Sequence, residues 1–131
     1  MRVLLLGATG NVGSRLLPAL IQRGHVVTAM VRDPSRLPTG VQRNKFHVER
    51  GDASKATAIK TVAMEHECDA IVNAAGAAVV TQWGKSDLQT IVDAVIRAAL
   101  EIGQERGELL RLWVFAGIGI LDVSPKYMLV D

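Results

Sequence analysis

The chain has 131 residues, of which 49% are hydrophobic and 21% charged, and its formal net charge is +2. This size and composition predict one globular domain, residues 1–131, with its own core. So small a charge, with no run of Lys or Arg, argues against nucleic acid as a partner, and no stretch is long and apolar enough for a signal peptide or a membrane span. The single cysteine, Cys68, cannot form an internal disulfide, so we expect a cytoplasmic protein without membrane contact and an inert structural thiol.

The first segment combines a strand, a glycine-rich turn and a helix. The apolar run Val3–Leu6 is typical of a central parallel strand. The turn Gly7-Ala8-Thr9-Gly10-Asn11-Val12-Gly13 follows, and an amphipathic helix is expected from Asn11 or Val12 to just before Gly24, with a kink at Pro18. In such a turn the first glycine permits the bend, the second lets a phosphate approach the backbone, and the third lets the helix pack against the strand. We predict that this turn binds a dinucleotide pyrophosphate at the helix N-terminus, the alternative being an ordinary strand-to-helix connection.

The rest of the chain alternates short apolar runs with helical patterns. Further strands are expected at Val26–Val31, Lys45–Arg50, Asp69–Asn73 and Leu110–Phe115, and helices at Ser54–Glu65 and Ser86–Ile102. Right-handed crossovers between such units predict an α/β fold with a doubly wound, Rossmann-like parallel sheet of about five strands in the order 3-2-1-4-5.

The two later helices have recognisable faces. In the first, Ile59, Val62 and Ala63 are expected to be buried. The second begins with a capping box of Ser86 and Gln89 and should end before Gly103. Its expected apolar face consists of Leu88, Ile91, Val92, Val95, Ile96, Ala99 and Leu100.

The strand order predicts where a ligand binds. In a doubly wound sheet the crevice lies beyond the carboxyl ends of the first and fourth strands, where the strand order reverses. The Gly7–Gly13 turn and the segment Asn73–Gly76 both map to that place. Two separate stretches of sequence therefore indicate one ligand site.

Arg32 ends the second strand, where NAD-preferring proteins place a carboxylate that binds the ribose 2′-hydroxyl. A guanidinium can instead form paired hydrogen bonds with a 2′-phosphate, and Arg36 could add a second contact. Asp33 complicates this interpretation, because it could bind a 2′-hydroxyl or pair with Arg32 on the surface. We favour NADP over NAD.

Together the Gly7–Gly13 turn, Val31-Arg32-Asp33-Pro34, Gly51-Asp52 and Asn73-Ala74-Ala75-Gly76 resemble the atypical short-chain dehydrogenase/reductases. The nearest group is the NmrA-like and flavin/biliverdin-reductase-like NAD(P)-binding proteins, and the resemblance covers residues 1 to about 122.

The resemblance implies roles for the matching positions. The pyrophosphate would be held by Gly7, Thr9, Gly10, Asn11, Val12 and Gly13. Asp52 would lie near the adenine amino group with Ala53 beside it, although Asp52 could equally be the N-cap of the following helix. The ribose and nicotinamide path would be lined by Ala74, Ala75 and Gly76.

The catalytic motifs of better-known superfamily members are missing. They use a serine with Tyr-x-x-x-Lys, in which the lysine lowers the pKa of the tyrosine. The only tyrosine here, Tyr127, is followed four residues later by Asp131, and Phe115–Gly119 lacks the serine. No catalytic residue is therefore predicted. In the loop after the fourth strand, Trp83 could cover a nicotinamide or simply anchor the loop, and Lys85 could contact an anion or remain solvated.

The three histidines, His25, His47 and His66, are scattered without metal-ligand spacing, so no metal site is predicted. Relatives continue with a sixth strand and a substrate-binding part, so the C-terminal part is expected to be short or truncated. The edge of the fifth strand then needs a cover, for which a homodimer is one candidate.

Two functions follow. One is an NADPH-dependent oxidoreductase acting on a small acceptor such as a flavin, quinone or carbonyl compound. The other is a non-catalytic module that senses NADP. A sugar-nucleotide epimerase or dehydratase is weaker, because those reactions depend on the tyrosine–lysine pair.

Overall fold

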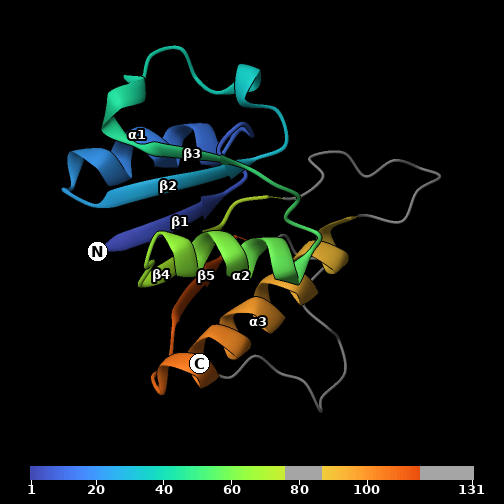
Figure 1. Ribbon diagram of the computed structural model, residues 1–131. Coiled ribbons are helices and arrows are strands. Elements are labelled where there is room, and N and C mark those ends of the chain that lie inside the picture. The colour runs from blue at the N-terminus through green and yellow to red at the C-terminus, as the bar shows by residue number, and fades with distance from the viewer. Residues whose placement is uncertain (76–86, 116–131) are drawn as a thin grey trace.

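The computed structural model describes residues 1–75 and 87–115, which form a parallel sheet covered by helices on both faces (Figure 1). The strands are β1 (Arg2–Leu6), β2 (Val26–Val31), β3 (His47–Arg50), β4 (Ala70–Asn73) and β5 (Arg111–Val114). The helices are α1 (Gly13–Gln22), α2 (Ala56–Glu65) and α3 (Asp87–Arg106), with short 3-10 turns at Pro34–Arg36 and Arg43–Lys45.

The sheet order is β3-β2-β1-β4-β5 with every pair parallel, which confirms the predicted doubly wound topology. The central strand β1 is fixed on both sides: Leu5 is paired with Ala29 of β2 and with Val72 of β4. The carboxyl ends of β1 and β4 therefore lie side by side at the point where the strand order reverses.

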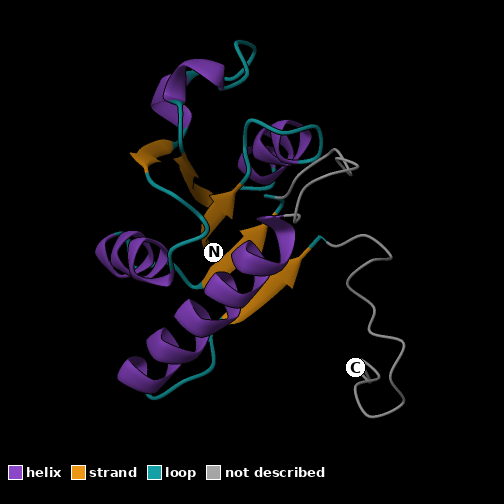
Figure 2. Cartoon of the chain, turned by 90° about the vertical axis from the view of Figure 1, so that its right-hand side faces the viewer, coloured by secondary structure: helices purple, strands orange, loops and turns teal. Residues whose placement is uncertain are grey.

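Helices lie on both faces of the sheet (Figure 2), and alternation along the strands divides the core into two layers. Val3 and Leu5 face α1 and pack in the layer that contains Leu17. Leu4 and Leu6 face the opposite side, where α2 and α3 bury Ile59 and Val95. A strand that is apolar at every position is required here because helices cover both faces.

Several predicted boundaries are wrong by a few residues. The third strand begins at His47 rather than Lys45, because Arg43–Lys45 forms a 3-10 turn. α1 begins at Gly13 rather than at Asn11 or Val12, and Pro18 lies inside it, so the kink expected there stays a prediction. α2 begins at Ala56 with Lys55 at its N-cap, so Asp52 is not the cap of this helix.

The predicted end of α3 is also wrong. The helix passes Gly103 and ends at Arg106, before Gly107, whose φ of +72° is the left-handed conformation common after a helix C-terminus. Gly103 serves contact rather than termination, because a Cβ there would lie 3.0 Å from the carbonyl oxygen of Glu108. The capping residue Ser86 lies outside the described residues.

The predicted apolar face of α3 is correct for Ile91 and Val95, which are buried, but Ile96 and Leu100 are exposed. Ala94, Ala98 and Ile102 complete the buried face instead. Small alanines on that face let α3 approach α2 and the sheet closely, which hydrophobicity alone does not reveal.

Along β5 the side chains also alternate. Leu112 packs toward α3, while Trp113 and Phe115 are exposed in the described part of the chain. Among the helices that the structure describes, none is both long enough and apolar enough to span a bilayer.

Candidate functional site

The glycine turn between β1 and α1 has the geometry that its spacing predicts. Gly7 has φ of +81°, and a Cβ there would lie 2.4 Å from the backbone nitrogen of Ala75. A Cβ on Gly13 would lie 1.8 Å from the carbonyl oxygen of Gly7. No side chain fits at either position. The first glycine therefore brings the turn against β4, and the third brings α1 against the turn.

The middle glycine is open instead. A Cβ on Gly10 would meet only the carbonyl oxygen of Gly7, at an ordinary 3.5 Å. Gly10 N donates to that oxygen (3.0 Å), and Ser14 N donates to Gly10 O (2.9 Å). Within residues 1–75 and 87–115, no hydrogen bond uses the backbone N–H groups of Asn11, Val12 or Gly13. Three successive free N–H groups at a helix N-terminus are suited to an anion.

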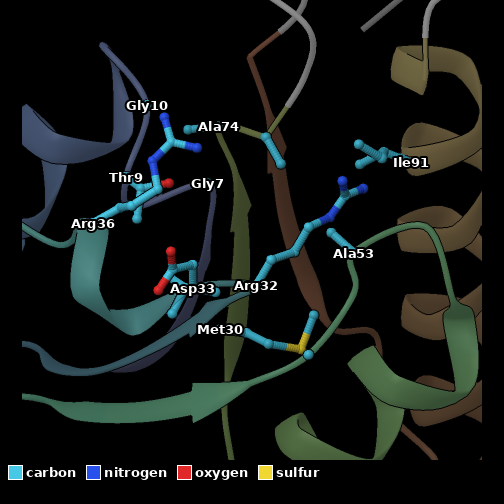
Figure 3. A pocket seen from close by; sticks show the side chains of 13 residues that line it. Gly7, Thr9, Gly10, Met30, Arg32, Asp33, Arg36, Ala53, Ala74 and Ile91 are labelled. Atoms are coloured by element: carbon cyan, nitrogen blue, oxygen red, sulfur yellow. The ribbon is translucent and has the colours of Figure 1, made fainter.

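A cavity of about 300 Å³ lies beneath this turn, at the carboxyl ends of the strands. It brings together most of the residues that the sequence singled out: Gly7, Thr9, Gly10, Arg32, Asp33, Arg36, Ala53, Ala74 and Ala75. Figure 3 labels most of these lining residues. It shows the side chains of Arg32 and Arg36 extending in different directions from the segment after β2. The convergence of residues from four strand ends is what the topology predicts.

Other predicted residues do not line the cavity. Asn11, Val12 and Gly13 belong to the glycine turn. The groups that they offer to a ligand are their backbone N–H groups rather than their side chains. Asp52 lies beside the lining residue Ala53 and contacts Arg32. Gly76 lies outside the described residues.

Sequence reasoning missed part of the lining, namely Met30, Val31, Gly51 and Ile91. The first three stand at the carboxyl ends of β2 and β3, so the topology contained the signal that could have found them. Gly51 is held close to Met30, because a Cβ would lie 2.9 Å from its sulfur.

Arg32 and Asp33 have different partners from those considered on the sequence. Arg32 Nη2 donates to Asp52 Oδ1 at 3.3 Å and not to its neighbour Asp33. Asp33 Oδ1 accepts hydrogen bonds from Ser35 N (3.0 Å) and Ser35 Oγ (2.6 Å), and these bonds lower the pKa of Asp33. The Asp33 carboxylate is thus the N-cap of the 3-10 turn Pro34–Arg36.

Asp52 plays a similar part after β3. Its Oδ1 accepts from Ser54 N (2.9 Å) and Ser54 Oγ (2.7 Å), and these bonds, with a smaller contribution from Arg32, lower its pKa. Asp52 therefore caps the turn that precedes α2 and not α2 itself. The charge of Asp52 remains beside the cavity.

The end of β4 is hydrogen-bonded to the end of β1, just before the glycine turn. Ala74 N donates to Leu6 O (2.9 Å), and Asn73 Oδ1 accepts from Ala75 N (3.1 Å). The Asn73 amide nitrogen is buried and has no partner among the described residues. The remaining residues considered for catalysis or substrate contact, Trp83, Lys85 and Tyr127, lie outside the described part of the chain, as does the segment 116–119.

Comparisons with known proteins agree with a dinucleotide-binding fold. A family model described as NAD(P)H-binding matches residues 7–126. A stretch of 38 residues is 60% identical to the 3-diazoavenalumate denitrifying reductase of a Streptomyces species, which covers 29% of this chain and 12% of that protein.

Solved structures show the same fold. An oxidoreductase of Lactococcus lactis superposes with a TM-score of 0.69 and 23% identity, over 94% of this chain and 51% of that one. A short-chain dehydrogenase of Leptospira borgpetersenii with bound NAD+ superposes with a TM-score of 0.70 and 18% identity, over 93% and 53%. The chain thus spans about half the length of these structures and a smaller share of the curated relative.

The doubly wound sheet with a glycine turn at its switch point defines a Rossmann-like dinucleotide-binding protein. Within that class, the chain belongs to the NAD(P)H-binding family whose model covers residues 7–126. This family is consistent with the resemblance to the atypical short-chain dehydrogenase/reductases.

Proposed function

We propose that this protein is an NADPH-dependent oxidoreductase that reduces a small acceptor such as a flavin, a quinone or a carbonyl compound. The observation that carries the proposal is the pair of arginines, Arg32 and Arg36, on the cavity beneath the glycine turn. Two guanidinium groups after β2 are suited to the 2′-phosphate that distinguishes NADP from NAD.

Asp33 is the competing group at this position, because it also lines the cavity and a carboxylate there can accept hydrogen bonds from the ribose hydroxyls. Its Oδ1 already accepts two hydrogen bonds from Ser35, so the other oxygen is the one left for a ribose hydroxyl. Two guanidinium groups on the same cavity outweigh this one carboxylate for a 2′-phosphate, and we therefore favour NADP.

The Arg32–Asp52 ion pair does not prevent this role. The Arg32 side chain is 63% exposed and that of Asp52 39%, and exposed ion pairs of this kind are weak. A phosphate can accept two hydrogen bonds from a guanidinium, which is a stronger arrangement. We expect Arg32 to exchange Asp52 for the phosphate when NADP binds.

The other residues fit the rest of the cofactor. The free N–H groups of Asn11, Val12 and Gly13 would hold the pyrophosphate, and the open side of Gly10 lets it approach. Ala53 and Asp52 would lie at the adenine, while Ala74 and Ala75, together with Gly76, would line the path to the nicotinamide.

NADPH supplies a hydride, so the overall reaction is NADPH plus acceptor plus a proton giving NADP+ and the reduced acceptor. This chain's own residues bind and orient the cofactor. No side chain is assigned as the proton donor, and water can fill that role for a flavin or quinone.

The relatives favour an enzyme over a sensor. The Streptomyces relative carries the name of a reductase, and the Lactococcus structure that of an oxidoreductase. The second candidate, a module that binds NADP and reports its redox state without turnover, is favoured by the absence of a Tyr-x-x-x-Lys motif in the 131 residues.

The proposal also covers the cellular compartment and the oligomeric state of the protein. A dinucleotide-binding domain with a single reduced cysteine suits the cytoplasm. Within the described residues β5 pairs only with β4, so a second copy could cover its free edge as a homodimer.

Calorimetric titration with NADPH, NADP+, NADH and NAD+ tests the cofactor. We expect the NADP forms to bind more tightly than the NAD forms by at least about tenfold, and Arg32→Gln or Arg36→Gln to reduce that preference severalfold. Arg23→Gln, which changes an exposed arginine at the end of α1, is the matched control. A folded protein that binds none of the four cofactors would contradict the proposal.

NADPH consumption in the presence of a panel of flavins, quinones and carbonyl compounds tests the reaction. Turnover with one class of acceptor supports the oxidoreductase. Tight NADPH binding without consumption across the panel supports the sensor instead.

A further inference from the structure

Away from the cofactor cavity, the fold brings together four side chains of the kinds that bind metal ions: His47, Glu49, Glu65 and His66. Ligand atoms of Glu49, Glu65 and His66 all lie within 4.8 Å of one another. The His66 Nε2 atom is 2.8 Å from Glu49 Oε1, and the His47 and His66 rings lie 5.3 Å apart between centroids. We propose that this cluster binds a divalent transition-metal ion with the ligand preferences of Zn²⁺.

The strand places two of these side chains together. In β3, His47 and Glu49 are two residues apart, so they point to the same face of the sheet. That face is the one covered by α2, because Val48 between them packs in the layer on the α1 side. The pair therefore lies on the α2 side of the sheet, with His47 exposed and Glu49 half-buried.

The helix supplies the other two. Glu65 is the last residue of α2, and His66 follows it as the C-cap. The His66 backbone is held in place, since its N–H donates to Val62 O (3.0 Å) and its carbonyl oxygen accepts from Arg2 Nε (2.9 Å). The His66 side chain is 17% exposed and that of Glu49 35%, whereas His47 and Glu65 are exposed, so an ion can reach the cluster from solvent.

The donor types decide the metal. Imidazole nitrogen together with carboxylate oxygen suits Zn²⁺ and its neighbours, whereas Mg²⁺ prefers oxygen ligands alone. An ion bound about 2.0–2.2 Å from each donor needs donors about 3–4 Å apart. Glu49 and His66 are already close to that spacing, and the Glu65 carboxylate lies within 4.8 Å of both. His47 is a nearby fourth donor, with its ring centroid 5.3 Å from that of His66.

The cluster is separate from the cofactor site. The residues that precede α2, such as Ala53, line the cavity, whereas Glu65 and His66 lie at the other end of this ten-residue helix. A helix of that length spans about 15 Å. On the strand, Glu49 precedes the lining residue Gly51 by two residues and does not itself line the cavity. The proposal is therefore independent of the proposed oxidoreductase function, and its failure would leave that function untouched.

A bound ion would join the edge strand to a helix. β3 is the edge of the sheet and pairs only with β2 among the described strands. A metal shared by β3 and α2 binds the folded chain and not the unfolded one, so it raises the unfolding temperature. The expected role is structural.

Calorimetric titration of the chelator-treated chain with ZnCl2 tests the site. We expect one ion per chain with micromolar or tighter affinity, no comparable heat with MgCl2, and an unfolding temperature that rises with Zn²⁺ concentration. His66→Gln should weaken binding at least about tenfold, and Glu49→Gln should also weaken it. His47→Gln serves if His66→Gln fails to fold by circular dichroism.

The matched control is His25→Gln. His25 Nδ1 lies 3.1 Å from the amino group of Met1, which is a second place where a metal could bind. Binding that survives His25→Gln but is weakened by the cluster variants supports the proposal. Absence of binding, binding lost with His25→Gln, or binding unchanged by His66→Gln, Glu49→Gln and His47→Gln would overturn it.

Discussion

Arg32 Nη2 lies 3.3 Å from Asp52 Oδ1, and this ion pair joins the segments that follow β2 and β3 at the mouth of the cavity. Asp52 is held for the contact by its two hydrogen bonds from Ser54, which lower its pKa. A full negative charge therefore stands beside the guanidinium that we propose for the 2′-phosphate.

Removing that charge should sharpen the preference for NADP. We expect Asp52→Asn to raise the ratio of NADPH to NADH affinity severalfold, because a surface carboxylate repels the phosphate by about 1 kcal/mol. The ratio isolates this effect, since any contact of residue 52 with adenine is common to both cofactors. Calorimetric titration measures it, and an unchanged ratio would mean that Asp52 lies too far from the phosphate to matter.

We expect replacement of glycine by alanine to have different effects at Gly13 and at Gly10 of the glycine turn. Gly13→Ala places a methyl group 1.8 Å from the Gly7 carbonyl oxygen, so we expect a loss of stability of about 3 kcal/mol or more. Gly10→Ala meets only an ordinary contact and should fold normally, while NADPH affinity falls about tenfold because the methyl group obstructs the phosphate. Thermal unfolding and calorimetry separate the two effects. Equal stability of both variants would contradict the packing argument.

Cys68 should be unreactive in the folded protein. Burial raises the pKa of its thiol from 9.0 to about 11, so the thiolate is scarce at neutral pH. Alkylation by iodoacetamide at pH 8 should be slow in the native chain and fast in urea.

The raised pKa of Cys68 also makes the stability of the folded chain depend on pH. A pKa that is raised in the folded state adds stability that is fully present below pH 9.0 and is lost as the pH rises toward 11. Between these values the free energy of unfolding of the native chain should therefore fall relative to Cys68→Ala. Parallel curves for the two proteins would show that the thiol is not buried.

Arg106 should stabilise the junction between α3 and the turn before β4. Its guanidinium donates to the Cys68 carbonyl oxygen and, at 3.5 Å, to that of Ala63. We expect Arg106→Ala to reduce the free energy of unfolding by about 1–3 kcal/mol, because a partly buried carbonyl loses its donor. Arg97→Ala, at an exposed position of the same helix, should change it by less than about 0.5 kcal/mol. Chemical denaturation compares the two variants, and similar losses would refute the assignment.

Local patterns predicted the strands and the turn well because both depend on near neighbours. The apolar run Val3–Leu6 and the three glycines that follow it determine a buried strand and a tight turn wherever they occur. The end of α3 depended on a distant contact instead. Gly103 resembles a terminator in sequence, but its function is to let Glu108 pack against it, and Gly107 ends the helix.

The amino-acid sequence alone determined the strand order, the position of the crevice and most of its lining, since these follow from hydrophobic periodicity, glycine spacing and the handedness of crossovers. Only the tertiary structure decided which charged side chains meet. Arg32 pairs with Asp52 rather than with Asp33, and Glu49 meets His66, because pairing β2 with β3 and laying α2 on the sheet set distances that sequence separation does not encode. Such side-chain pairs depend on how the elements pack. The sequence alone therefore could not predict that His47, Glu49, Glu65 and His66 form a cluster.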